Sequence, residues 1–170
     1  MTAPFVIMPL SPNHDRLAFS CGVAALDAYL HRQAGQDVRR RVANCFVAIL
    51  PDARLIAGYY TLSAASIPVT DLPPALAHRL PRYPIVPTAL VGRLAVDRQY
   101  AKRGLGGALL FDALERAANA DPAIFALVVD AKDAHAADFY RHFGFQPFAS
   151  RPMSFFLALA TAAKLKPLPK

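Results

Sequence analysis

Carboxylates are scarce in this sequence. Its 170 residues include 12 acidic side chains, and Glu115 is the only glutamate among them. A carboxylate that serves as a general base must therefore be sought among the aspartates. The 19 lysines and arginines leave a net charge of +7 and an isoelectric point near 9.8. This surplus favours an anionic partner, such as nucleic acid, a phosphorylated cofactor or an acidic protein, without choosing among them.

Other absences exclude whole classes of protein. No apolar run reaches the ~18 residues that a membrane-spanning helix needs, and the N-terminus has neither the basic start nor the apolar block of a signal peptide. Cys21 and Cys45 lie far apart without metal-type spacing, so we interpret both as buried small apolar side chains and predict no metal site. We expect a cytoplasmic protein that does not enter a membrane. The length suits a single domain, which we place at 1–160, followed by a basic tail at 161–170.

A glycine-rich turn between a strand and a helix is the main chemical motif. An apolar strand is predicted over 89–96, and it ends at Asp97. A helix begins after the turn, with apolar residues along one face at Leu110, Ala113, Leu114 and Ala117. Glycines allow the backbone to approach a bulky anion, and the first N–H groups of a helix lack partners within it. With Arg98, Lys102 and Arg103 nearby, the turn suits a pyrophosphate.

The spacing of the glycines narrows the choice of pyrophosphate. No Lys-Ser or Lys-Thr follows them, so the nucleotide-binding pattern G-x-x-x-x-G-K-S/T is absent. The dinucleotide pattern G-x-G-x-x-G also fails, because position 109 is Leu. The run Lys102-Arg103-Gly104-Leu105-Gly106 resembles instead the acetyl-CoA turn of the GNAT acetyltransferases. The family usually has Gln or Arg where this chain has Ala101, so backbone amides and neighbouring basic residues would hold the phosphates. A turn of this kind also occurs as a plain strand-to-helix connection without a ligand.

A second signature of the same superfamily follows one helix and one strand later. The run Ala137-Asp-Phe-Tyr-Arg-His-Phe-Gly-Phe145 contains F-Y-x-x-x-G-F, which resembles its closing element. The resemblance implies that Tyr140 is the general acid, since a phenol with a pKa of ~10 stays protonated at neutral pH. Without the resemblance, Tyr140 would be interpreted as a core aromatic. The resemblance also implies a cofactor site formed by Leu94, Ala95, Val96, Lys102, Arg103, Gly104, Leu105, Gly106 and Gly107.

The order of predicted elements gives the fold class. Apolar runs predict an edge strand at 3–9, a helix from 19 that Gly35 breaks, and an antiparallel hairpin at 44–50 and 55–67. A proline-rich loop at 68–87 contains a short helix near 75–80. After the central strand and helix come a strand at 124–129, a helix at 134–143 and a final hairpin at 145–148 and 153–159. We predict an α/β domain of the GNAT type, with a mixed, mostly antiparallel sheet and helices on both faces.

The N-terminal segment narrows the resemblance further. The pattern Phe19-x-Cys21-Gly22-x3-Leu26-Asp27-x-Tyr29-Leu30 and the strand Gly58-Tyr-Tyr-Thr-Leu-Ser63 resemble the GNAT toxins of type II toxin–antitoxin modules. The resemblance spans roughly 19–157. It implies acetylation of the α-amino group of aminoacyl-tRNA, which blocks translation. It also implies a homodimer and a ribbon-helix-helix antitoxin, with operator DNA bound only through the toxin–antitoxin complex.

The basic surface and one aspartate complete the predicted site. Arginines that neutralise RNA phosphates add affinity that falls with salt, and our candidates are Arg39, Arg40, Arg41, Arg79, Arg82 and Arg93. A run such as Arg39–Arg41 is in general also compatible with a plain solvated face. The resemblance implies that the strand at 94–96 supplies a backbone N–H to the oxyanion. Asp97 either assists deprotonation of the amine or caps the following turn.

Two alternatives to the toxin remain at the level of sequence. The first is a GNAT enzyme that acetylates a small amine or a protein N-terminus, and such an enzyme would not need Arg39–Arg41. The second is a module that binds nucleic acid or an antitoxin and has lost catalysis. Ala101 in the phosphate turn is the feature that favours this second alternative.

Overall fold

The chain forms one seven-stranded sheet in the order β1-β2-β3-β4-β5-β7-β6. The structure is a computed structural model that describes residues 5–51, 54–80 and 83–162. Most neighbouring strands are antiparallel, whereas β4 and β5 are parallel. This confirms the predicted α/β fold class. The strands are β1 Val6–Pro9, β2 Asn44–Ile49, β3 Ile56–Pro68, β4 Ile85–Val96, β5 Ala126–Asp130, β6 Gln146–Pro147 and β7 Ser154–Ala158.

Six α-helices and two 3-10 turns connect these strands in the described part of the chain. The helices are α1 Ala24–Arg32, α2 Ala34–Arg39, α3 Pro74–Ala77, α4 Leu105–Ala118, α5 Ala134–His142 and α6 Leu159–Ala162. The 3-10 turns are η1 Val69–Asp71 and η2 Arg98–Tyr100. The described residues divide into two compact units, one formed by 5–51, 54–63 and 92–113 and the other by 64–80, 83–91 and 114–162.

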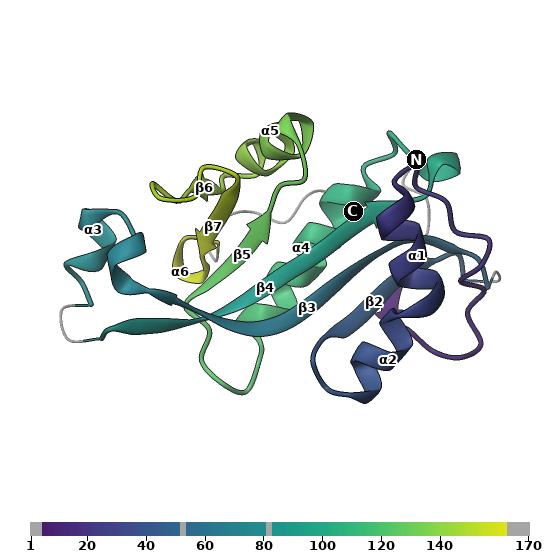
Figure 1. Ribbon diagram of the computed structural model, residues 1–170, viewed down its shortest axis with the longest axis horizontal. Coiled ribbons are helices and arrows are strands. Elements are labelled where there is room, and N and C mark those ends of the chain that lie inside the picture. The colour runs from purple at the N-terminus through teal and green to yellow at the C-terminus, as the bar shows by residue number, and fades with distance from the viewer. Residues whose placement is uncertain (1–4, 52–53, 81–82, 163–170) are drawn as a thin grey trace. The chain divides into compact units, whose positions relative to one another are not determined.

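The first unit is built on the predicted hairpin. β2 pairs with β3 in antiparallel register, with Phe46 opposite Tyr60 and Val47 opposite Tyr59. Successive residues of a strand point to opposite faces, and the two tyrosines follow this rule. Tyr59 packs in a core cluster with residues of α1 and β2, and Tyr60 donates a hydrogen bond to Asp112 of α4 at 2.6 Å. Helices therefore contact both faces of this part of the sheet. Figure 1 shows α1 and α2 in front of β2, in blue and purple.

The helix break falls two residues before the position that we predicted. α1 ends at Arg32, Gln33 separates the helices, and Gly35 lies inside α2. The prediction that Gly35 breaks the helix is therefore wrong. Gln33 still accepts the helical hydrogen bond from Asp37 N at 3.1 Å, so the ladder is nearly continuous. Glycine lowers helix stability by only about 1 kcal/mol, which the surrounding contacts override.

The second unit contains the parallel part of the sheet. Thr88–Val91 of β4 pair with Ala126–Val129 of β5, and β5 pairs with β7 in antiparallel register. A core cluster forms around Val86, Val128 and Phe156. The final hairpin is present but short, because β6 has two residues. β4 begins at Ile85 rather than 89, so the proline-rich loop is shorter than predicted, and the carbonyl of Pro87 accepts a hydrogen bond from Phe125 N at 2.8 Å.

Three further observations bear on the earlier exclusions. No helix in the described ranges is long and apolar enough to span a membrane. Across the same residues, no group of three or more His, Cys, Asp and Glu side chains is arranged to hold a metal ion. Cys45 is buried as expected, but Cys21 is only half-buried, and its Sγ donates to the carbonyl of Val23 at 3.7 Å. Of the basic tail predicted at 161–170, residues 161–162 belong to α6 and residues 163–170 lie outside the described residues.

Candidate functional site

The glycine-rich turn has the backbone geometry of an anion site. Lys102 and Gly104 adopt left-handed conformations with φ of 62° and 79°. Such a conformation is unfavourable for a side chain but accessible to glycine. The hydrogen bond from Ala108 N to Gly104 O, 3.1 Å long, closes the first turn of α4. The N–H groups of residues 105–107 therefore have no acceptor within the helix. Lys102 and Arg103 are exposed beside them, so the turn offers both amides and positive charge to a pyrophosphate.

A close contact between strand and helix fixes the position of this turn. A Cβ built on Gly58 would lie 3.0 Å from Cδ1 of Leu109 and 3.1 Å from the carbonyl oxygen of Ala95. A side chain at position 58 would therefore push α4 away from β3. Leu105 and Leu109 are both buried, at 3% and 0% exposure. The glycine in the Gly58-Tyr-Tyr motif thus allows the first turn of α4 to lie against the sheet.

Asp97 holds the connection between β4 and the turn. One carboxylate oxygen accepts a hydrogen bond from Ser20 N at 2.9 Å, and the other accepts one from Gln99 N at 2.9 Å. The side chain is 8% exposed. Of the two roles predicted for Asp97, this geometry supports the capping role. A base at this position would have to give up its hydrogen bonds to these two partly buried backbone N–H groups.

Arg93, predicted to bind the substrate, stacks on an aromatic ring of α1. Its guanidinium lies 3.7 Å from the ring centroid of Tyr29, and the Tyr29 hydroxyl donates to Asp37 at 2.9 Å. Burial, followed by the hydrogen bond to Asp37, raises the pKa of Tyr29 well above its usual value. A guanidinium over a ring is attracted by the π-electrons at distances up to about 6 Å. Tyr29 and Asp37 therefore hold Arg93 in one orientation, a role that the sequence analysis did not assign to them.

Four of the other predicted RNA contacts, Arg39, Arg40, Arg41 and Arg79, are exposed. Arg39 ends α2, Arg40 caps it, and Arg41 has a left-handed φ of 62°. Arg79 is exposed beyond α3 in the second unit, and Arg82 lies outside the described residues. Leu94, Ala95 and Val96 form the end of β4, as predicted.

Tyr140 lies on α5 in the second unit, in an aromatic cluster. It is 6% exposed, and its ring centroid lies 5.9 Å from that of Phe145 and 6.2 Å from that of Phe155. Burial raises the pKa of Tyr140 to about 12, with a smaller contribution from the charge of Asp130. Its hydroxyl makes no hydrogen bond to any other described residue. The phenol is therefore protonated at neutral pH and free to donate.

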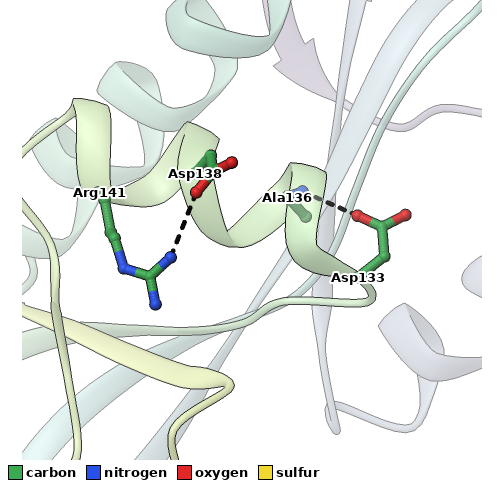
Figure 2. A network of polar contacts seen from close by, with 4 residues as sticks. All are labelled: Asp133, Ala136, Asp138 and Arg141. Atoms are coloured by element: carbon green, nitrogen blue, oxygen red, sulfur yellow. Dashed lines mark hydrogen bonds and ion pairs between the residues drawn. The ribbon is translucent and has the colours of Figure 1, made fainter.

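The spacing F-Y-x-x-x-G-F has a structural explanation. Gly144 follows α5 with a φ of 90°, and Phe145 N returns to donate to the carbonyl of Tyr140 at 3.1 Å. This left-handed residue ends the helix and brings Phe145 against Tyr140. Figure 2 shows the polar contacts of α5, where Asp133 accepts from Ala136 N at 2.8 Å and Asp138 pairs with Arg141 at 3.3 Å. Both ends of α5 are thus fixed, and with them the position of Tyr140.

Comparisons with known proteins agree with the family resemblance found in the sequence. The family model for the acetyltransferase (GNAT) domain matches residues 87–155. The chain is 32% identical to a probable toxin TacT from Sinorhizobium fredii, over 94% of each chain. It is 35% identical to a tRNA-acetylating toxin from Mycobacterium tuberculosis, over 92% of this chain and 93% of that one.

Solved structures with a similar fold cover nearly the whole of this chain. AtaT complexed with acetyl-methionyl-tRNAfMet is 25% identical, with a TM-score of 0.86 over 94% of this chain and 97% of that one. AtaTR bound with acetyl-CoA is also 25% identical, with a TM-score of 0.79 over 94% and 96% of the two chains. The phosphate turn, the tyrosine on α5 and these similarities over nearly the whole length lead to one conclusion. The chain belongs to the GNAT superfamily and is an acetyl-CoA-dependent N-acetyltransferase.

Proposed function

We propose that this acetyltransferase is the toxin of a type II toxin–antitoxin module. In this proposal it transfers an acetyl group to the α-amino group of aminoacyl-tRNA and so blocks translation. The similarity of 35% over 92% of the chain to a tRNA-acetylating toxin is the observation that supports it most. The net charge of +7 agrees with a polyanionic substrate.

The residues present fit acetyl-CoA. The N–H groups of residues 105–107, together with Lys102 and Arg103, would bind the pyrophosphate. The co-substrate supplies an acetyl group activated as a thioester. The backbone N–H groups at Leu94–Val96 are the proposed donors to the acetyl oxygen as negative charge develops on it. Ala101 adds no side chain to the phosphates, so we expect the amides and the two basic residues to bear this function alone.

The acceptor amine does not require a strong base. An α-amino group has a reference pKa of ~7.7–8, so a useful fraction is neutral at physiological pH. The hydrogen bonds of Asp97 to Ser20 N and Gln99 N also argue against its service as a base. The proton released by the attacking nitrogen passes to solvent in this scheme.

Tyr140 is the proposed general acid. As the carbon–sulfur bond breaks, Tyr140 would donate its hydroxyl proton to the sulfur of the departing thiolate, which leaves as the thiol. The raised pKa keeps this proton on the phenol until it is needed. Reprotonation from water then restores the phenol for the next turnover. General acid catalysis of this kind contributes about 10²- to 10⁴-fold in rate.

The remaining partners are part of the same proposal. The exposed arginines Arg39, Arg40, Arg41 and Arg79, together with Arg93 and Arg82, would bind the phosphates of tRNA. A ribbon-helix-helix antitoxin would neutralise the enzyme, and operator DNA would bind only to the joint complex. We also propose a homodimer and a cytoplasmic location, where charged tRNA is found.

The test is a paired transfer assay. Purified enzyme and its Tyr140→Phe variant are each incubated with labelled acetyl-CoA and total charged tRNA. We expect label on the aminoacyl group with the unmodified enzyme and almost none with the variant, although both bind acetyl-CoA. Label on small amines or protein N-termini, with none on any charged tRNA, would contradict the proposal and favour the alternative GNAT enzyme. Acetyl-CoA binding too weak to measure would favour the non-catalytic module.

A further inference from the structure

Two arginine side chains converge over a glycine of α2. A Cβ built on Gly35 would lie 3.1 Å from Nη1 of Arg16 and 3.3 Å from Nη1 of Arg39. The two guanidinium nitrogens are therefore at most 6.4 Å apart, the sum of these distances. Sequence analysis identified Arg39 as one of a basic run but gave no role to Arg16, which lies 23 positions away. Gly35, which was expected to end a helix, therefore lies next to both guanidinium groups and forms the floor of the space between them.

Neither arginine has a counter-charge among the residues that the structure describes. Within the ranges that the structure describes, Arg16 and Arg39 form no ion pair and no hydrogen bond through their guanidinium groups. The acidic residue between Gly35 and Arg39 is Asp37, and its carboxylate accepts the hydrogen bond of the Tyr29 hydroxyl. Asp15, next to Arg16 in the sequence, accepts a hydrogen bond from Ala18 N. Two like charges this close repel each other unless an anion lies between them.

The loop that bears Arg16 is anchored rather than free. Phe19 N donates to the carbonyl of Arg16 at 3.2 Å, and the carbonyl of Phe19 lies 2.9 Å from Nε2 of His31 on α1. Arg16 itself is half-buried. Its charge also reaches the interior, since it opposes the rise in the pKa of Cys45 that burial causes. The guanidinium of Arg16 is thus placed near Gly35 by the fold, not by the local sequence.

Gly35 leaves room for this arrangement. In a helix, residues i and i+4 lie on the same face, so the side chain of Arg39 passes over position 35. A Cβ at position 35 would meet both guanidinium groups, at 3.1 and 3.3 Å, so the two arginine side chains would have to shift. α2 lies beside α1 in Figure 1, and Arg32, Arg40 and Arg41 are exposed on the same two helices and the turn that follows. The surroundings of the pair are therefore basic.

We propose that Arg16 and Arg39 bind one backbone phosphate of the tRNA, in a cradle whose floor is Gly35. This rests on the proposed function, which it deepens by naming a contact to the substrate. Guanidinium groups suit phosphate because their planar N–H forks bind its oxygens in pairs. The pyrophosphate of acetyl-CoA is assigned to the turn at 102–107, and the proposed tRNA substrate supplies further phosphates of the same chemistry.

The first measurement uses inorganic phosphate as the probe. The thermal unfolding midpoint of the full chain is followed against phosphate concentration at fixed ionic strength, with saturating CoA present to occupy the phosphate turn. Phosphate should raise the midpoint of the unmodified protein and should not raise that of Arg16→Gln, Arg39→Gln or Gly35→Ala. Gly35→Ala keeps both charges and removes only the space. Lys132→Gln removes one exposed charge outside the cradle and should respond like the unmodified protein.

The second measurement is tRNA affinity as a function of salt. Each phosphate contact contributes about 0.7–0.9 to the slope of log K against log salt. Arg16→Gln and Arg39→Gln should each reduce the steepness of that slope by up to this amount, and the double variant should reduce it no further. Arg39 is exposed, so its variant should fold even if Arg16→Gln does not.

Two results would overturn the cradle. One is an Arg39→Gln variant with the phosphate response and salt slope of the unmodified protein. The other is a raised KM for acetyl-CoA in the arginine variants with tRNA binding unchanged, which would assign the site to the cofactor. Failure of the proposed function looks different. If no charged tRNA is acetylated, but phosphate and RNA binding still depend on both arginines and on Gly35, the cradle stands and the substrate assignment falls.

Discussion

Replacement of Tyr140 by Phe separates catalysis from stability. The change removes one hydroxyl that has no hydrogen bond to any other described residue and leaves the aromatic cluster with Phe145 and Phe155 in place. Because the ring stays packed and no hydrogen-bond partner is left unpaired, we expect the free energy of unfolding to change little at neutral pH. We expect kcat to fall by about 10²- to 10⁴-fold, the usual contribution of a general acid.

The pH dependence makes this prediction sharper. With a pKa of about 12, only about 1% of Tyr140 is ionised at pH 10. The rate should therefore rise as the substrate amine loses its proton near pH 8 and stay level to pH 10. A phenol with its usual pKa of ~10 would instead give half the maximal rate at pH 10. A steady-state profile from pH 6 to 10.5, with aminoacyl-tRNA stability monitored in parallel, distinguishes the two cases.

The same pKa predicts a stability difference of definite sign. Because the pKa of Tyr140 is higher in the folded than in the unfolded chain, its neutral form stabilises the fold. This contribution is complete below pH 10 and is lost as the pH rises through 12. Relative to Tyr140→Phe, the unmodified enzyme should lose about 1.4 kcal/mol of unfolding free energy by pH 11, measured by urea denaturation. A variant that keeps its full rate would refute the acid role. If the unfolding free energies of the unmodified enzyme and Tyr140→Phe changed equally with pH, the raised pKa of buried Tyr140 would be refuted.

Three further predictions concern the support of the site. Gly58→Ala should destabilise the fold by about 1–3 kcal/mol in urea denaturation, because its Cβ meets Leu109 and a backbone carbonyl that cannot both retreat; an unchanged midpoint would contradict this. Asp97→Ala leaves two backbone N–H groups without acceptors and should lower the free energy of unfolding by about 1–3 kcal/mol. Asp97→Asn, which keeps one carbonyl oxygen, should lower it less. Equal losses in the two variants would argue against the hydrogen bonds as the cause. Burial raises the pKa of Cys45 to about 12, so in the folded protein iodoacetamide at pH 8 should label Cys21 and spare Cys45 until denaturant is added. Rapid labelling of both would show that Cys45 is reachable.

Features that depend on neighbours in the sequence could be predicted from it. The glycine turn, the helix that follows and the helix of Tyr140 are specified by local turn chemistry and by the period of apolar residues. The hairpin at 44–67 follows from β-rich runs around a turn. Where two local signals competed, prediction was less accurate. Gly35 was interpreted as a helix break, but it lies inside α2, next to the side chains of Arg16 and Arg39. β4 was begun four residues late, because Pro87 suggested a loop.

Contacts between distant residues could not be predicted in this way. Asp97 caps its own turn through Gln99, which the sequence suggested, but its bond to Ser20 spans 77 positions. Tyr60 and Asp112 are 52 positions apart. Pairings of this kind are set by the packing of α1, α2 and α4 against the sheet, which no single segment contains.

The sequence by itself determined the superfamily, the fold class and the two motifs on which the chemistry is proposed, because each of these is written in residues within one strand, turn or helix. Only the tertiary structure decided which of the described charged side chains have an interaction partner and which do not. It stacked Arg93 on Tyr29, occupied both oxygens of Asp97, and brought Arg16 to Arg39 over a glycine. The reason is physical: whether a charge is paired depends on the side chains that folding brings within a few ångströms, and the sheet draws these from segments far apart in the chain.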